Sequence, residues 1–226
     1  MRFKDVFSII GPSMIGPSSS HTAGAIRLGR VARQLFGELP EKAELTFFGS
    51  FADTYRGHGT DLAVVGGLLD YETDHPRIPD SLEDAEAAGM EVIFQTSSGQ
   101  HTHPNTARIS LSSGEREMTV VGASIGGGNI EILSVNQFDL KFTGEFPTLV
   151  ISHLDRPGMI ADITALLQRK NLNIGYMDLD RKGRGGEAMT VIEADSPVTG
   201  DLIAEVKQLS MVEDVRTVDL AERGQL

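Results

Sequence analysis

Three stretches in the first half of the chain place apolar residues at helical spacing. Residues 23–36 carry them on one face with arginines between, and Gly37 follows as the expected end of the helix. Residues 60–69 repeat the pattern, and residues 81–88 predict a short helix for which Ser81 is the expected cap. The pattern therefore predicts three helices separated by segments of a different period.

Those separating segments alternate apolar with polar positions and favour β-branched and aromatic residues, which is the pattern of strands. The pair Ser113 and Gly114 between two of them predicts a hairpin turn. A further apolar stretch at residues 3–10 stops before Pro12, because proline disfavours helical backbone in the residue ahead of it. The five predicted strands are residues 43–49, 91–96, 107–112, 115–123 and 130–135.

The composition changes across residues 136–147, and we place a domain boundary there. Beyond it the patterns follow the order strand, helix, strand, strand, helix, strand, which is the split βαβ plan of a ferredoxin-like sandwich. We therefore expect an α+β protein, with an α/β domain over residues 1–140 and a ferredoxin-like domain over residues 148–226. The six elements of the second domain are predicted at residues 148–152, 159–170, 172–181, 187–194, 199–209 and 212–218.

The charge of the chain limits its partners. Its 226 residues include 32 acidic and 20 basic side chains, a net charge of -12, which disfavours nucleic acid or an anionic membrane surface. Residues 1–5 lack the apolar run of a signal peptide, and no stretch approaches the roughly 20 apolar residues of a membrane span. We expect a cytoplasmic protein.

The chain contains no cysteine. It therefore cannot supply a thiolate nucleophile, form a disulfide or ligate an iron-sulfur cluster through sulfur.

The first candidate site is the segment GPSSSHT at residues 16–22, where the 23–36 helix begins. Free backbone N–H groups and side-chain donors could converge there on a small anion such as a carboxylate. The alternative is that these hydroxyls only cap the helix, although four exceed what one cap needs. The side chains concerned are those of Ser18, Ser19, Ser20, His21 and Thr22.

The second candidate is His58 in the segment GHGTD at residues 57–61. Its flanking glycines let the backbone approach a ligand, and an imidazole is well suited to accept a proton near pH 7. The alternative is a loop histidine required only for the turn. His21 and His58 taken together favour a site.

Two weaker signals follow. Gly126, Gly127 and Asn129 belong to a glycine run whose N–H groups could surround an oxyanion, or which could simply be a turn. His101 and His103 have the spacing of a metal pair but lack a third ligand nearby in sequence, so an exposed loop is the alternative.

The segment DRPG at residues 155–158 lies between a predicted strand and a predicted helix. Gly158 would let a ligand approach the backbone, and the start of the helix could receive a carboxylate. An ordinary strand-to-helix connection is the alternative.

Together, GPSSSHT, GHGTD and the glycine run at residues 122–128 resemble the β subunit of bacterial iron-sulfur L-serine dehydratases along essentially the whole chain. The N-terminal part is similar in fold to the allosteric substrate-binding domain of some phosphoglycerate dehydrogenases. Residues 146–220 resemble an ACT domain, a regulatory module that usually binds amino acids between paired copies.

The resemblance implies an L-serine ammonia-lyase made of two chains, which converts L-serine to pyruvate and ammonia. A cysteine-bearing α subunit would hold a four-iron four-sulfur cluster, in agreement with the lack of cysteine here. The iron would act as a Lewis acid on the serine hydroxyl while a protein base removes the α-proton.

By motif match the resemblance implies His58 as the base and His21 as the residue that orients substrate or assists proton transfer. Ser18, Ser19, Ser20 and Thr22 would hold the substrate carboxylate, with Gly126, Gly127 and Asn129 also at the substrate. In the ACT domain the expected effector residues are Asp155, Gly158 and Met159, and self-association through paired ACT domains is expected.

Two other functions compete with this hypothesis. A non-catalytic regulatory chain would bind an amino acid through both domains, but such a pocket has no need of a proton acceptor. A histidine-metal hydrolase would depend on His101 and His103 and requires further ligands.

Overall fold

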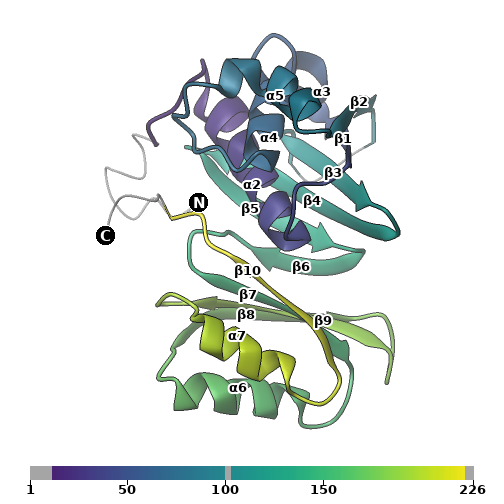
Figure 1. The fold of residues 1–226 in the computed structure, drawn as a ribbon, viewed down its shortest axis with the longest axis vertical. Helices are drawn as coiled ribbons and strands as arrows, with labels where there is room; N and C mark the ends of the chain where they lie inside the picture. Colours follow the sequence, from purple (N-terminus) through teal and green to yellow (C-terminus); the bar gives the residue numbers. More distant parts are fainter. Residues whose placement is uncertain (1–11, 100–102, 222–226) are drawn as a thin grey trace. The chain divides into compact units, whose positions relative to one another are not determined.

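The computed structural model describes residues 12–99 and 103–221 and divides the chain into two compact units, Met1–Asn136 and Gln137–Leu226 (Figure 1). The apolar stretch predicted at residues 3–10 lies outside the described residues, as does His101.

The first unit is built on a mixed sheet. Its strands follow the order β2-β1-β3-β4-β5, in which β1 and β2 are parallel and the other pairs antiparallel. All five strands predicted from the sequence are confirmed, and Ser113 pairs with Arg116 across the predicted hairpin turn. The strands are β1 (Lys42–Phe48), β2 (Glu91–Ser97), β3 (Thr106–Ser113), β4 (Arg116–Gly126) and β5 (Asn129–Val135).

Helices cover this sheet, and the three predicted ones are confirmed. The long helix α2 packs on β4 and β5, and α4 packs on α2. A π-helical turn, η1 (Ser19–Ala23), leads into α2. Gly37 follows the last residue of α2 and has the left-handed conformation, with φ +87°. The α-helices are α2 (Gly24–Phe36), α3 (Gly49–Thr54), α4 (Thr60–Leu68) and α5 (Ser81–Ala87), and η2 (Ile78–Asp80) is a 3₁₀ turn. The helix α3 was not predicted from the sequence.

The role predicted for Ser81 is wrong. Asp80 occupies the N-cap position of α5, and Ser81 is the first residue inside that helix. The hydroxyl of Ser81 is buried and donates a hydrogen bond to the carbonyl oxygen of Leu62 at 2.8 Å. Ser81 therefore ties α5 to α4, because a buried hydroxyl requires a partner.

Two glycines allow α2 and α4 to approach closely. A Cβ atom on Gly29 would lie 2.2 Å from the carbonyl oxygen of Val64, and one on Gly67 would lie 2.1 Å from the carbonyl oxygen of Ile26. Such distances are far below van der Waals contact, so only glycine fits at either position. The two backbones are therefore in direct contact at this crossing.

The second unit has the predicted order of elements from β7 onward. Its antiparallel sheet follows the order β10-β7-β9-β8, and α6 and α7 lie on the same face of it (Figure 1). Leu149, Ile163 and Ile192 belong to the buried core between this sheet and these helices. The elements are β7 (Thr148–Leu154), α6 (Met159–Arg169), β8 (Ile174–Arg181), β9 (Glu187–Ala194), α7 (Gly200–Lys207) and β10 (Val212–Val218).

One strand, β6 (Phe138–Phe142), was not predicted, and it crosses residue 140, where we expected the first domain to end. The compact units divide earlier, between Asn136 and Gln137, so β6 falls in the second unit. The backbone N–H groups of Asp139 and Lys141 donate to the carboxylates of Asp180 and Asp178 at 2.8 and 2.9 Å.

Within the described parts of the chain, no helix has both the length and the apolar character needed to cross a bilayer.

The crossing of α2 and α4 generates a prediction about stability. We expect Gly67→Ala to lower the free energy of unfolding by about 2–3 kcal/mol, because its methyl group must displace the backbone of α2. Gly66→Ala is the matched control: its Cβ would meet only ordinary contacts at 3.5 Å or more, and alanine favours the helix by about 1 kcal/mol. Urea unfolding of the full chain measures both variants, and equal effects would contradict the account.

Candidate active site

His21 lies in the π-helical turn η1 at the start of α2, where the sequence predicted the first turn of a helix. Ser18 occupies the N-cap, and its side-chain oxygen accepts a hydrogen bond from the backbone N–H of His21 at 3.3 Å. Its carbonyl oxygen accepts the N–H of Thr22 at 2.8 Å. The capping function considered for these hydroxyls is thus real for Ser18.

Hydroxyl groups approach both nitrogens of the His21 ring. The Oγ atoms of Ser18 and Ser20 each lie 3.3 Å from Nδ1 and 3.2 Å from one another. On the other side, the Oγ of Ser50 in α3 lies 3.4 Å from Nε2. Phe51 packs against the ring at a centroid distance of 5.2 Å and an angle of 66°. The imidazole is therefore confined on several sides.

His58 lies against His21, although the two are far apart in the sequence. The ring centroids are 4.8 Å apart with 47° between the planes. The backbone N–H of His58 donates to the carbonyl oxygen of Thr54 at 3.0 Å. The next residue, Gly59, has φ +68° and caps α4, a left-handed conformation that glycine adopts without strain. The two predicted histidines are thus brought together.

The surroundings of His21 disfavour its charged form. Burial lowers the pKa of His21 below its usual value of 6.5, and repulsion from His58 lowers it further. Near neutral pH His21 is therefore a neutral imidazole with one N–H and one lone pair.

Several buried polar atoms of the first unit, three of them in the two histidine motifs, have no hydrogen-bond partner among the described residues. Buried polar groups in proteins are nearly always paired, so such a group of exceptions requires an explanation. A bound ligand with its own donors and acceptors would supply it. The three atoms in those motifs are Nδ1 of His58, Oγ1 of Thr22 and Oγ1 of Thr60, and the others are Oγ of Ser124, Oδ1 of Asn105 and Nε of Arg33.

Ser124 and Asn105 were not among the predicted site residues. Ser124 is fully buried at the end of β4, and a Cβ on Gly24 would lie 2.1 Å from its Oγ, so its hydroxyl faces the junction of η1 and α2. The backbone N–H of Ser124 donates to the carbonyl oxygen of Asn105 at 2.9 Å.

The glycine run forms the turn between β4 and β5. Gly126 pairs with Asn129, and the two residues between them, Gly127 and Gly128, have φ +64° and +82°. This backbone is that of a two-residue hairpin turn, which favours glycine and accounts for the run. The carbonyl oxygen of Gly128 accepts a hydrogen bond from Arg27 at 2.8 Å, which ties the turn to α2. A role for Gly126, Gly127 and Asn129 at the substrate stays a prediction.

His103 lies in a cleft of about 290 Å³ at the ends of β1 and β2, lined also by Phe48, Asp53 and Ser97. Its Nδ1 accepts a hydrogen bond from the backbone N–H of Asn105 at 3.2 Å. Over residues 12–99 and 103–221, no three His, Asp or Glu side chains lie close enough to hold a metal ion.

In the second unit, the residues expected to bind an effector are engaged within the protein. The carboxylate of Asp155 accepts hydrogen bonds from Arg181 at 2.8 Å and from the N–H of Gly185 at 3.3 Å, and the bond from Arg181 holds the pKa of Asp155 below its usual value. Gly158 has φ +86° and caps α6. The side chain of Met159 is 2% exposed and packs in the core.

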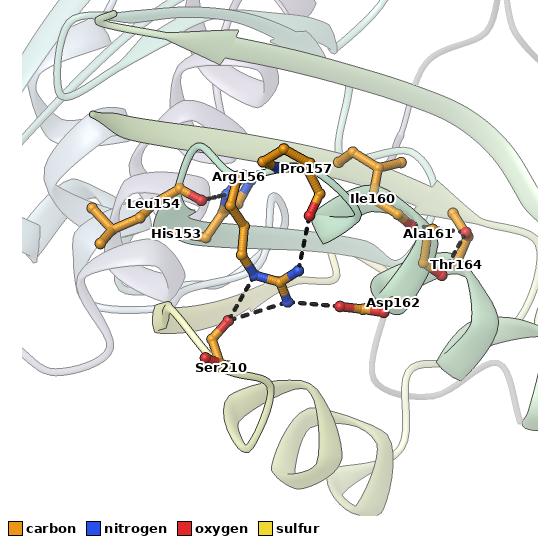
Figure 2. A network of polar contacts seen from close by, with 9 residues as sticks. All are labelled: His153, Leu154, Arg156, Pro157, Ile160, Ala161, Asp162, Thr164 and Ser210. Atoms are coloured by element: carbon orange, nitrogen blue, oxygen red, sulfur yellow. Dashed lines mark hydrogen bonds and ion pairs between the residues drawn. The ribbon is translucent and has the colours of Figure 1, made fainter. Parts of the chain in front are cut away.

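Arg156, in the loop between β7 and α6, ties this loop to α6 and to the segment that contains Ser210, as Figure 2 shows. Its guanidinium donates to the carboxylate of Asp162 at 2.6 Å, to the carbonyl oxygen of Ser210 at 3.4 Å and to that of Pro157 at 3.2 Å. Arg156 and Asp155 thus tie the loop to different segments of the unit, a feature that spacing alone did not predict.

Comparison with known proteins matches both units to families. The profile of the serine dehydratase beta chain family matches residues 3–89, and that of the ACT domain matches residues 148–210. The chain is 44% identical to the probable L-serine dehydratase beta chain of Bacillus subtilis, over 96% of this chain and 99% of that protein. It is 39% identical to the L-serine dehydratase beta chain of Peptoniphilus asaccharolyticus, over 87% and 89% of the two chains.

A third similarity covers part of a longer protein. The chain is 28% identical to the D-3-phosphoglycerate dehydrogenase of Methanocaldococcus jannaschii, over 57% of this chain and 24% of that protein.

The lowered pKa of His21 predicts how its contribution to stability depends on pH. At a pH above 6.5 that contribution is fully present, and it is lost as the pH falls toward the lower pKa of the folded state, because the unfolded chain then binds a proton that the folded chain does not. We expect the free energy of unfolding to fall less between pH 8 and pH 5.5 in His21→Gln than in the wild type. Urea unfolding at both pH values measures the difference, and identical losses would contradict it.

Proposed function

The chain belongs to the serine dehydratase beta chain family and carries an ACT domain at its C-terminus, and from this premise we propose that it is the β subunit of a two-chain enzyme that converts L-serine to pyruvate and ammonia. In this reaction the substrate loses its α-proton and its β-hydroxyl group, and the resulting enamine tautomerises and is hydrolysed. A base for the α-proton and a binding site for the carboxylate are therefore required.

One observation carries the proposal: two imidazoles with ring centroids 4.8 Å apart lie beside hydroxyl groups, and their two motifs contain buried polar atoms without a partner in the described residues. A proton acceptor next to a group of donors suits an amino acid whose α-proton must be removed. A structural histidine pair would not require the unpaired atoms.

We assign the base to His58. Its Nδ1 has no partner in the described parts of the chain, whereas hydroxyl groups approach both nitrogens of His21. Because no described residue engages this buried nitrogen, its lone pair is not committed to another group of the protein. His21, neutral and confined, orients the substrate or assists proton transfer.

The carboxylate of the substrate is assigned to the hydroxyls of the segment that holds His21. The Oγ atoms of Ser18 and Ser20 lie 3.2 Å apart. The Oγ1 atom of Thr22 is buried and has no partner in the described residues. Ser19 lies in the same turn. A carboxylate accepts several such hydrogen bonds at once.

The residues of this chain do not fit as ligands of an iron-sulfur cluster. The sequence has no cysteine, and the described residues contain no group of three His, Asp or Glu that could hold a metal. We therefore assign the four-iron four-sulfur cluster to a cysteine-bearing α subunit, and we place the assembled enzyme in the cytoplasm.

The ACT domain is assigned a regulatory function, with an amino acid bound near Asp155, Gly158 and Met159 and with self-association through paired ACT domains. Because Asp155 is bonded to Arg181 and Gly185, a ligand there must use the backbone of the loop or displace those bonds. The ACT domain also favours the competing function of a regulatory chain without catalysis, which the next experiment separates from the lyase.

Substitution of the two histidines tests the assignment. We expect His58→Ala to lower kcat of the α–β complex by about 10²–10⁴-fold, the usual contribution of a general base, and His21→Ala to lower it less. His75→Ala is the control, because His75 stacks on Tyr71 at 4.0 Å and has no part in the pair. The measurement is anaerobic formation of pyruvate from L-serine.

The opposite order, with His21 indispensable and His58 dispensable, would reverse the two roles. Full activity of both variants would favour the regulatory chain.

The effector site is tested by calorimetry of the full chain with L-serine. We expect His58→Ala to keep the heat of binding at the ACT domain and Asp155→Asn to lose it, because the loop is then released from Arg181. Asp201→Asn, on the exposed start of α7, is the control. If Asp155→Asn binds L-serine as the wild type does, this site is wrong.

A further inference from the structure

We propose that Ser50 is a positioning residue of the active site: its hydroxyl donates a hydrogen bond to Nε2 of His21 and holds that imidazole in one tautomer, which leaves His58 as the proton acceptor. This inference rests on the proposed function and adds a residue that neither motif contains. Ser50 belongs to α3, a helix that the sequence analysis did not predict.

The contacts of His21 indicate what Ser50 does. Ser18 and Ser20 both lie on the Nδ1 side of the ring, and Ser50 is the hydroxyl that approaches Nε2 in the described structure. A neutral imidazole has one N–H and one lone pair, so the partner of each nitrogen decides where the proton resides. With Ser50 donating to Nε2, the proton of His21 resides on Nδ1 and is donated to the serine pair.

The backbone of α3 holds Ser50 in place. A Cβ on Gly49, which has φ +53°, would lie 2.6 Å from the carbonyl oxygen of Pro104, so α3 begins in close contact with that loop. Phe51 is fully buried, lies against Phe47 at 6.1 Å and also contacts His21. Thr54 donates its hydroxyl to the carbonyl oxygen of Ser50 at 2.7 Å.

The same helix also fixes the other imidazole, because the carbonyl oxygen of Thr54 accepts the backbone N–H of His58. Ser50 and Thr54, four residues apart, share one face of α3. Ala52 and Asp53 line the cleft that contains His103. α3 therefore sets the positions of both histidines from a single element.

The contact of Ser50 with the Nε2 lone pair of His21 decides which of the two histidines can accept the substrate proton. If Nε2 of His21 were free, either histidine could take the proton, and the ring could rotate or change tautomer between turnovers. Engagement of Nε2 by Ser50 removes that freedom. Its effect falls on the catalytic step, since Ser50 need not touch the substrate.

The kinetic test compares Ser50→Ala with Asp53→Asn in the α–β complex. Asp53 lines the cleft that contains His103 and has no part in the proposed machinery. We expect Ser50→Ala to lower kcat about five- to tenfold, the effect of one lost hydrogen bond, with KM changed less than about twofold. Ser50→Thr, which keeps the hydroxyl, should restore most of the rate, and Asp53→Asn should match the wild type.

The spectroscopic test uses the full chain without its partner. The ¹⁵N shifts of the His21 ring, assigned by their loss in His21→Gln, should indicate a single tautomer with the proton on Nδ1. In Ser50→Ala the two shifts should move toward each other as the tautomers mix. Unchanged shifts in Ser50→Ala, or a wild-type proton on Nε2, would overturn the proposal.

The two tests separate this inference from the function it rests on. A tautomer change in Ser50→Ala together with an inactive wild-type complex would mean that Ser50 positions His21 and that the proposed lyase is wrong. A normal kcat in Ser50→Ala within an active complex would mean that the lyase is right and the positioning role is wrong.

Discussion

The close packing of α2 on α4 is the constraint on which the candidate site depends. The segment that leads into α2 holds His21, and the segment that leads into α4 holds His58. Gly29 and Gly67 let the two helices meet backbone to backbone, and the imidazole contact belongs to the same arrangement. Larger residues at the crossing would separate the helices that carry the two rings.

Much of the fold could be predicted from the sequence, because most elements show a clear period and are bounded by glycine or turn residues. The two exceptions have physical reasons. At six residues α3 is too short to establish a helical period, and it follows β1 without a loop. The alternation of Phe138, Leu140 and Phe142 is the pattern of a strand and could have revealed β6, but the change of composition around it was interpreted as a domain boundary.

The candidate site was predictable only in part. His21 and His58 stand in distinctive motifs, yet their contact is a tertiary feature that spacing could not establish. Ser50, Asn105 and Ser124 come from α3, a loop and the end of β4, and spacing alone does not bring any of them to either histidine. In the ACT domain the pattern located the loop at Asp155 correctly, but the internal bonds of Asp155 and Arg156 depend on Arg181, Gly185 and Ser210, which lie far along the chain.

The central claim is that this cysteine-free chain contributes imidazoles and hydroxyl groups to a reaction that it completes only with a cysteine-bearing partner. Anaerobic assay of pyruvate formation from L-serine by this chain alone, the partner alone and the two combined tests it most directly. The account predicts activity in the combined sample alone. Dehydration of L-serine by this chain alone, or by the partner alone at the rate of the mixture, would contradict it.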